Sequence, residues 1–197
     1  MRLPSLRCLL VTALSLVLAG CTELPNDVGV RQHRFPRARR VLHPAAIALW
    51  NDNPNIRGDP RILINLTLQQ AFFFRGKTLI GQSTISTGRI GYETPPGKYK
   101  VIQKDANHVS SEFGDYVNRA GAVVRRDVDV NRDSPPRGAH FDGARMPYFL
   151  RFTEGYGMHA GFVPRFRASH GCIRMPMTMA KHFFDAAEIG TRVDVIE

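Results

Sequence analysis

The sequence predicts a mostly β protein with one helix in its C-terminal half, preceded by a signal peptide and a flexible tether. Three observations support this: apolar residues alternate through residues 61–69, turn-forming residues separate short apolar runs, and one late segment shows helical spacing. The 197 residues suffice for one globular domain with appendages. A content of 43% hydrophobic and 22% charged residues excludes a polytopic membrane protein and a fully disordered chain.

Residues 1–20 have the three-part layout of a secretory signal peptide. Arg2 and Arg7 precede an apolar run over residues 8–18, and the small residues Ala19 and Gly20 close it. The run is shorter than the ~20 residues that a membrane-spanning helix needs. A permanent span is therefore the weaker alternative.

Leu18-Ala19-Gly20-Cys21 resembles the lipobox of bacterial lipoproteins, in which the cysteine is acylated and begins the mature chain. The resemblance implies lipidation of Cys21, although an ordinary cysteine after an ordinary cleavage site stays the alternative. Thr22 follows, whereas Asp at that place signals retention in the inner membrane. We therefore expect a periplasmic protein that is lipid-anchored in the inner leaflet of the outer membrane.

Residues 21–45 are predicted to be the lipidated cysteine and a basic tether, with five arginines in residues 31–40. The chain's net charge of +10 suits nucleic acid, an anionic membrane or an acidic polymer. A lipidated periplasmic protein does not meet chromosomal DNA, so no nucleic-acid partner is expected. The tether suits lipid headgroups or cell-wall carboxylates.

Residues 46–197 form the predicted folded domain. Ile62, Ile64, Leu66 and Leu68 alternate in a strand over residues 61–69. The runs 71–74 and 78–85 flank Arg75-Gly76-Lys77, which predicts a hairpin. Pro95-Pro96-Gly97 predicts a turn before a strand through Tyr99 and Ile102.

The second half of the domain is expected to begin with long loops and short strands over residues 104–147, which are polar and rich in Gly, Pro, Asp and Arg. Two short strands follow at residues 148–152 and 157–159. Pro176 is expected to be the first residue of a helix that runs to about Glu188. Gly190 should end this helix, before a last strand over residues 192–196.

The chemistry is expected to lie in residues 157–174. Because Cys8 is removed and Cys21 is lipidated, Cys172 is the one thiol left in an oxidising compartment. A cysteine nucleophile needs a base and donors for the oxyanion. His159 can supply the base, and the backbone amides of Gly171 and Cys172 can point at the oxyanion. The positive end of the following helix would favour the thiolate.

Ser169-His170-Gly171-Cys172, preceded by a histidine, resembles the signature of the L,D-transpeptidases, also called the YkuD family. Ser86-Thr87-Gly88, residues 94–99 and residues 157–161 extend the resemblance over roughly residues 61–197. The resemblance implies a YkuD-type β-sandwich with one helix packed on it. Many members have more than the ten residues that separate His159 from His170 here, which affects the expected shape of the loop over the site.

The resemblance also implies roles for single residues. Cys172 matches the nucleophile and His159 the proton donor and acceptor. His170, Ser169 and Gly171 match positions that support the geometry of the site. Arg174 matches a position often held by Arg or Asn, and we expect it to bind a substrate carboxylate.

Other residues have competing interpretations. Cys172 could be a buried structural thiol, and His159, His170 and Cys172 could ligate zinc, although no CxxC or HExxH motif is present, so no metal is expected. Surface or packing roles are expected for several further residues: His182, Phe72, Phe73, Phe74, Arg165 and Arg167. The two arginines have substrate attraction as their alternative. Four histidines match no role: His33, His43, His108 and His140.

By this resemblance the chain is a cysteine-dependent acyltransferase of peptidoglycan without a cofactor. Cys172 would attack the carbonyl of an L-centre residue, normally diaminopimelate, in a stem peptide, and D-alanine would leave. The acceptor stays open between another stem peptide, a protein lysine, a free D-amino acid and water. A hydrolase that cuts the same bonds and a non-catalytic wall-binding lipoprotein are the alternatives.

Overall fold

The computed structural model describes residues 47–164 and 166–197 of the chain. The predicted signal peptide, the predicted lipidation site Cys21 and the predicted tether lie outside these residues, as does Arg165. Among the described residues, no helix is long and apolar enough to cross a bilayer.

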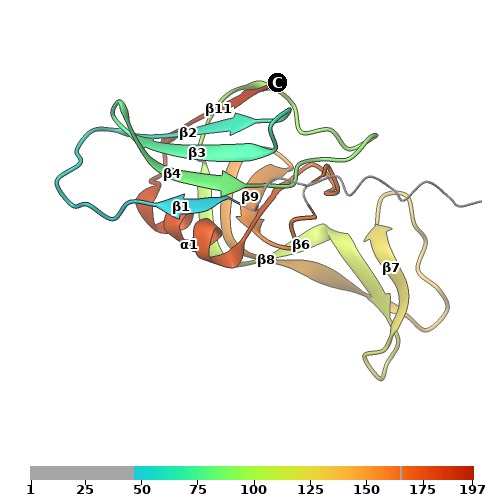
Figure 1. Ribbon diagram of the computed structural model, residues 1–197. Coiled ribbons are helices and arrows are strands. Elements are labelled where there is room, and N and C mark those ends of the chain that lie inside the picture. The colour runs from blue at the N-terminus through green and yellow to red at the C-terminus, as the bar shows by residue number, and fades with distance from the viewer. Residues whose placement is uncertain (1–46, 165) are drawn as a thin grey trace, which may run out of the picture. The chain divides into compact units, whose positions relative to one another are not determined.

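Two β-sheets form a sandwich with one helix packed on it, as expected (Figure 1). The first sheet contains, in spatial order, β1 (Ala48–Trp50), β4 (Thr78–Thr84), β3 (Gln70–Arg75), β2 (Pro60–Asn65), β11 (Arg192–Ile196) and β5 (Gly97–Lys100). The second contains β10 (Ile173–Met175), β9 (Tyr156–Ala160), β8 (His140–Thr153), β6 (Gln103–Val117) and β7 (Val123–Asp129). The helix α1 spans Met177–Ala186.

The core is built from the alternating residues of the strands and one face of the helix. Ile62, Ile64 and Phe73 have no exposed surface, and Phe183 of α1 packs edge-on against Phe73 at a centroid distance of 5.2 Å. Trp50 of β1 covers the same pair of rings. The helix thereby closes one side of the core beneath the first sheet (Figure 1).

The hairpin of β3 and β4 around residues 75–77 and the last strand β11 confirm the predictions for those segments. The strand predicted over residues 61–69 is too long, because β2 ends at Asn65. The side-chain oxygen of Asn65 accepts a hydrogen bond from the amide of Leu68 at 2.6 Å, which turns the chain and leaves Leu68 58% exposed.

The strand after Pro95-Pro96-Gly97 also ends early, because β5 stops at Lys100 and Ile102 lies exposed beyond it. The two short strands predicted at residues 148–152 and 157–159 lie within β8 and β9. The strands β1 and β10, of three residues each, were not predicted.

The helix is shorter than predicted at both ends. Pro176 precedes the first helical residue in an extended conformation. Ala187 is extended as well, and the amide of Glu188 donates to Oγ1 of Thr191 at 2.8 Å instead of continuing the helix. Gly190 therefore lies in the turn after the helix, at a φ of 92°, and does not itself end it.

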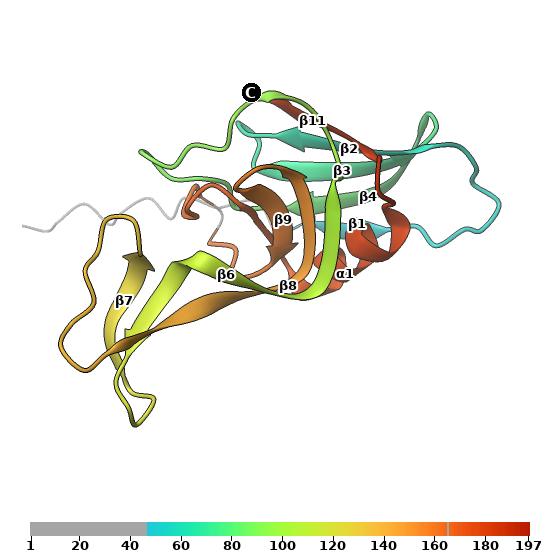
Figure 2. The same ribbon diagram turned by 180° about the vertical axis from the view of Figure 1, so that it is seen from behind.

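The prediction of long loops and short strands for residues 104–147 is wrong, because β6 has 15 residues and β8 has 14. Most of this segment belongs to β6, β7 and β8, which extend beyond the sandwich as an arm, here defined as residues 109–146 (Figure 2). Most side chains of the arm are exposed or half-buried, so its strands need no alternation of apolar and polar residues. The pattern that identifies strands was therefore missing.

We expect Phe73→Ala to lower the free energy of unfolding by about 3–5 kcal/mol, because it removes a fully buried ring. Leu68→Ala is the matched control in the exposed turn and should change it by less than about 0.5 kcal/mol. Urea denaturation followed by fluorescence measures both. Equal losses in the two variants would contradict this description of the core.

Candidate active site

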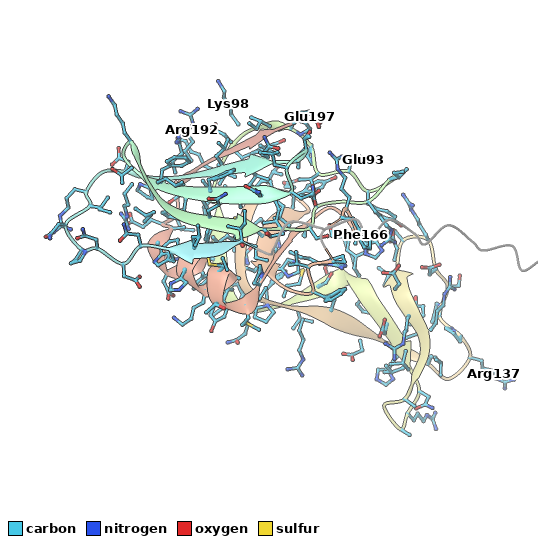
Figure 3. All side chains as sticks on the ribbon, viewed as in Figure 1. Glu93, Lys98, Arg137, Phe166, Arg192 and Glu197 are labelled. Carbon is cyan, nitrogen blue, oxygen red and sulfur yellow. The ribbon has the colours of Figure 1, made fainter. Side chains whose placement is uncertain are left out.

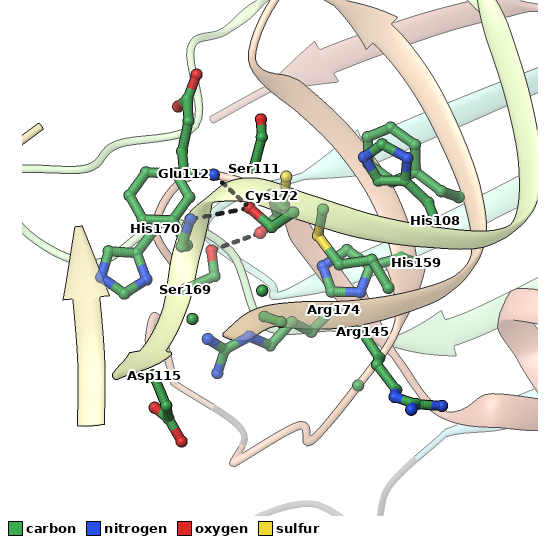
Figure 4. Close-up of a pocket in the computed structure, with 18 of the residues that line it drawn as sticks. His108, Ser111, Glu112, Asp115, Arg145, His159, Ser169, His170, Cys172 and Arg174 are labelled. Atoms are coloured by element: carbon green, nitrogen blue, oxygen red, sulfur yellow. Dashed lines mark hydrogen bonds between the residues drawn. The ribbon is translucent and has the colours of Figure 1, made fainter. Parts of the chain in front are cut away.

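A cavity of about 700 Å³ lies between the arm and the ends of β9 and β10. Five of the predicted site residues line it together: Cys172, His159, Ser169, His170 and Arg174 (Figure 4). The structure thus brings together residues from two separate strands and from the turn before β10.

The register of three strands determines which side chains reach this cavity. Leu150 of β8 pairs with Met158 of β9, and Met158 pairs with Ile173 of β10. All three side chains are buried in the core. Because successive side chains of a strand point to opposite faces, the residues before and after these three point to the cavity.

The cavity-facing residues of β8, β9 and β10 form two rows that run across the three strands. The first row contains His159. It pairs with Arg174 of β10 and lies level with Phe149 of β8, whose ring centroid is 6.3 Å from that of His159. Phe149 is buried without belonging to the core of the sandwich. It forms an apolar wall beside the imidazole.

The neighbouring row contains Cys172. Arg151 of β8 pairs with Gly157 of β9, and Cys172 lies level with Gly157, one residue before the β9–β10 pairing begins. Gly157 has no side chain to separate Arg151 from Cys172. A Cβ there would come within 2.3 Å of the Phe149 ring, so this position requires glycine.

His159 has a neutral imidazole in a fixed tautomer. Its Nδ1 bonds to the carbonyl oxygen of Ala160 at 2.9 Å, so Nδ1 carries the proton and the lone pair is on Nε2. Burial lowers the pKa of His159 to about 4, and Arg174 and His108 add to the lowering. The imidazole is therefore uncharged at neutral pH, with no proton on Nε2.

Cys172 is a thiol in its resting state, and the expected stabilisation of a thiolate is wrong. Burial raises the pKa of the Cys172 thiol, and the amide of Gly157 together with Arg151 and Arg174 opposes this only in part. The three extended residues of β10 separate Cys172 from α1, which at ~3.3 Å per residue puts the helix dipole out of reach.

Among the hydrogen bonds of the described residues, none joins the Cys172 thiol to the His159 imidazole. Sγ of Cys172 contacts the carbonyl oxygen of Gly155 at 3.8 Å. Both groups open onto the same cavity, as a thiol and a neutral imidazole. Proton transfer between them would accompany attack on a substrate.

Ser169 shapes the turn before the thiol. Its hydroxyl donates to the carbonyl oxygen of Cys172 and accepts the amide of Gly171 at 3.1 Å. The amide of Gly171 is thus engaged, and its predicted role as an oxyanion donor is wrong for this conformation. Gly171 has a φ of 113°, and a Cβ there would come within 2.7 Å of Tyr156.

The segment that follows β4 holds this turn in place. Ser86 and Arg174 exchange two backbone hydrogen bonds, and the amide of Ser169 donates to the carbonyl oxygen of Thr87. Thr94 links the two segments, because its hydroxyl accepts the amide of Gly88 and donates to the carbonyl oxygen of Gly171 at 2.6 Å. These contacts explain why Ser86-Thr87-Gly88 and Thr94 accompany the cysteine motif.

His170 joins the turn to the arm. Its ring stacks on Phe113 of β6 at a centroid distance of 4.4 Å and meets the edge of Tyr92 at 4.7 Å. Arg89 donates to Nε2 of His170 at 2.7 Å and pairs with Asp127 of β7 at 3.1 Å. Burial lowers the pKa of His170, and Arg89 lowers it further. This histidine therefore anchors the arm.

Sequence reasoning missed several of these contributors. Arg89, Phe113 and Asp127 are far from the motif in sequence, and no local pattern marks them. His108 was given no role, yet it lines the cavity, stacks on Phe149 at 4.2 Å and bonds to Asp105 at 3.1 Å. In the sequence, nothing except its being a histidine indicates a role for His108.

The remaining predicted residues have structural surroundings. His182 stacks on Trp50 at 4.9 Å, and Arg167 pairs with Glu197 and donates to the carbonyl oxygen of Leu66. Phe73 lies in the core and Phe74 beneath Arg61. Within residues 47–164 and 166–197, no group of three or more His, Cys, Asp or Glu side chains is placed to hold a metal.

A resting thiol predicts a specific pH dependence. With Cys8→Ser and Cys21→Ser leaving Cys172 as the one thiol, we expect its alkylation by iodoacetamide to accelerate about tenfold per pH unit from pH 6 to 8, because the thiolate fraction rises with pH below a raised pKa. Cys172→Ser in the same background gives the blank. A rate that is constant over this range would reveal a thiolate and contradict the assignment.

The family model described as the L,D-transpeptidase catalytic domain, YkuD, matches residues 59–195. YqjB of Bacillus subtilis (strain 168), named as an L,D-transpeptidase, is 26% identical over 153 residues, which cover 74% of this chain and 76% of YqjB. YbiS of Escherichia coli (strain K12), which carries the same family name, is 26% identical over 141 residues, or 69% of this chain and 44% of YbiS.

Solved structures show the same fold. An L,D-transpeptidase from Mycobacterium smegmatis superposes with a TM-score of 0.55 at 14% identity, covering 71% of this chain and 59% of that one. One from Stackebrandtia nassauensis gives 0.51 at 21% identity, over 71% and 56% of the two chains. This chain spans little more than half of these structures. With the family model covering most of its folded part, the chain belongs to the L,D-transpeptidase (YkuD) family.

Proposed function

We propose that this protein is a peptidoglycan L,D-transpeptidase that works through a thioester on Cys172. The observation that carries the proposal is the pair of adjacent rows on one sheet face, which places a thiol and a neutral imidazole in a single cavity. Membership of the family supports the reaction class.

In the first half of the reaction, Sγ of Cys172 attacks the carbonyl of the L-centre residue in a stem peptide, normally diaminopimelate. Nε2 of His159 takes the thiol proton and returns it to the nitrogen of the departing D-alanine. The carbon–nitrogen bond breaks, and the acyl group remains on Cys172 as a thioester.

In the second half, an amine attacks the thioester. His159 takes a proton from the amine and returns it to the cysteine sulfur, so that the thiol is restored. Another stem peptide as acceptor gives a cross-link, a protein lysine a tether and a free D-amino acid an exchanged terminus. Water as acceptor would make the protein a hydrolase.

The position of the protein in the cell is part of the proposal. Leu18-Ala19-Gly20-Cys21 supports acylation of Cys21, and Thr22 supports transfer to the outer membrane. A lipid anchor there would hold the catalytic domain in the periplasm, next to its polymeric substrate. The basic residues 31–40 would contact anionic headgroups or wall carboxylates.

Purified protein incubated with a tetrapeptide stem should release D-alanine, and adding an amine should give the matching adduct by mass spectrometry. Cys172→Ala should give no product above the level without enzyme while unfolding at the same temperature, because only the nucleophile is lost. The surface variant Lys77→Ala is the control. Product from Cys172→Ala would contradict the thioester route, and release without adduct at every amine concentration would indicate the hydrolase.

Cys21→Ser should move the protein from the membrane fraction to the soluble periplasmic fraction, because it removes the proposed site of acylation. Cys8→Ser is the matched control within the expected signal and should leave the protein on the membrane. Fractionation followed by immunoblotting measures both. Membrane retention of Cys21→Ser would contradict the anchor.

A further inference from the structure

Arg151 is held rigidly in the row of Cys172. Its Nε donates to Oε1 of Gln103 at 2.7 Å, the residue that pairs with it on β6. Its guanidinium lies over the ring of Phe149, 5.1 Å from the centroid. A guanidinium fixed by one hydrogen bond and one ring loses little freedom when it binds a further group.

The two Nη groups of Arg151 have no protein partner within the described residues. The Arg151 side chain makes no salt bridge there, and its one side-chain hydrogen bond uses Nε, which leaves the two Nη groups as donors. By contrast, Arg89 is engaged by His170 and Asp127, and Arg167 by Glu197. Two parallel Nη donors match the geometry of a carboxylate.

Arg151 is also better placed than two other arginines of the cavity, Arg145 and Arg174. It lines the same cavity as Cys172 and lies two strands away in the same row, with Gly157 between them. Arg145 is exposed and lies six residues before Arg151 on β8, outside the row of Cys172. Arg174 is half-buried in the row of His159, where the charge of Asp127 acts on it.

We infer that Arg151 is a specificity-determining residue that binds a carboxylate of the stem peptide beside Cys172. The inference rests on the proposed function, which supplies a peptide rich in carboxylates. Three carboxylates of that peptide have the required chemistry: the C-terminal group of D-alanine, the side-chain group of diaminopimelate and the α-carboxylate of the preceding D-glutamate. The Cys172 motif contains no signal for this residue.

The test measures binding in the full-length Cys172→Ala protein, which separates recognition from turnover and from any effect of Arg151 on the thiol. Isothermal titration calorimetry compares Cys172→Ala with Cys172→Ala/Arg151→Gln. The probes are the unmodified tetrapeptide stem and three versions in which one carboxylate at a time is a carboxamide. The control is Cys172→Ala/Arg137→Gln, which removes the same charge from an exposed residue of the arm outside the cavity (Figure 3).

We expect Arg151→Gln to weaken binding of the unmodified peptide by about 10- to 100-fold, as loss of a hydrogen-bonded charge pair does. One of the three amidations should weaken binding to the parent by a similar factor and have little effect in Arg151→Gln, which identifies the carboxylate. Arg151→Lys should recover part of the affinity, because it restores the charge without the fork. Unfolding temperatures of the variants show whether each is folded.

Equal affinity of the Arg151→Gln and parent proteins would overturn the inference. The same would follow if all three amidations weakened binding equally in both proteins, or if the parent bound no peptide at all. Turnover by the protein with an intact Cys172 tests the proposed function separately. A protein that binds through Arg151 without releasing D-alanine would therefore refute the proposed reaction and leave the recognition by Arg151 standing.

Discussion

The pairing of β8, β9 and β10 is the constraint on which the rest of the molecule depends. One residue from each strand, Leu150, Met158 and Ile173, packs into the core. Since side chains alternate along a strand, burying this row presents its neighbours on either side to the cavity. The hydrophobic effect that stabilises the sandwich thus also fixes the positions of the Cys172 thiol and the His159 imidazole.

The turn that carries the thiol is held by main-chain contacts from elsewhere in the fold. Backbone hydrogen bonds from the segment after β4 and the hydroxyl of Thr94 fix residues 169–174. His170 connects the same turn to the arm through Phe113 and Asp127. The site is thereby supported from the first sheet on one side and from the arm on the other.

Local patterns in the sequence predicted the parts of the fold that bury one face. The alternation through Ile64, the hairpin at Gly76 and the helical spacing around Phe183 all identified elements of the core. The arm was missed because few of its side chains enter the core, so its strands carry no periodic signal. Asn65 ended its strand through a side-chain hydrogen bond that hydrophobicity does not encode.

The candidate site, like the fold, could be predicted only where a local sequence pattern specifies it. The motif placed Cys172 and His159 in one cavity correctly, because a short segment of chain joins them. Contacts between distant segments could not be predicted, since Arg89 and Arg151 acquire their neighbours only through tertiary pairing. The state of the thiol was misjudged for a related reason, because burial and the length of β10 decide it.

The connection between β9 and β10 has both of its ends fixed independently of its middle. At one end the amide of Gly161 donates to the carbonyl oxygen of Met175, and at the other Ser169 is bonded to Thr87. Because both anchors are main-chain hydrogen bonds, we expect a change in the number of residues between them to leave the Cys172 thiol and the His159 imidazole in place. The length of this connection therefore sets the part of the cavity lining that Gly161 and Phe162 provide, while a one-residue insertion within β9 would turn the His159 side chain into the core.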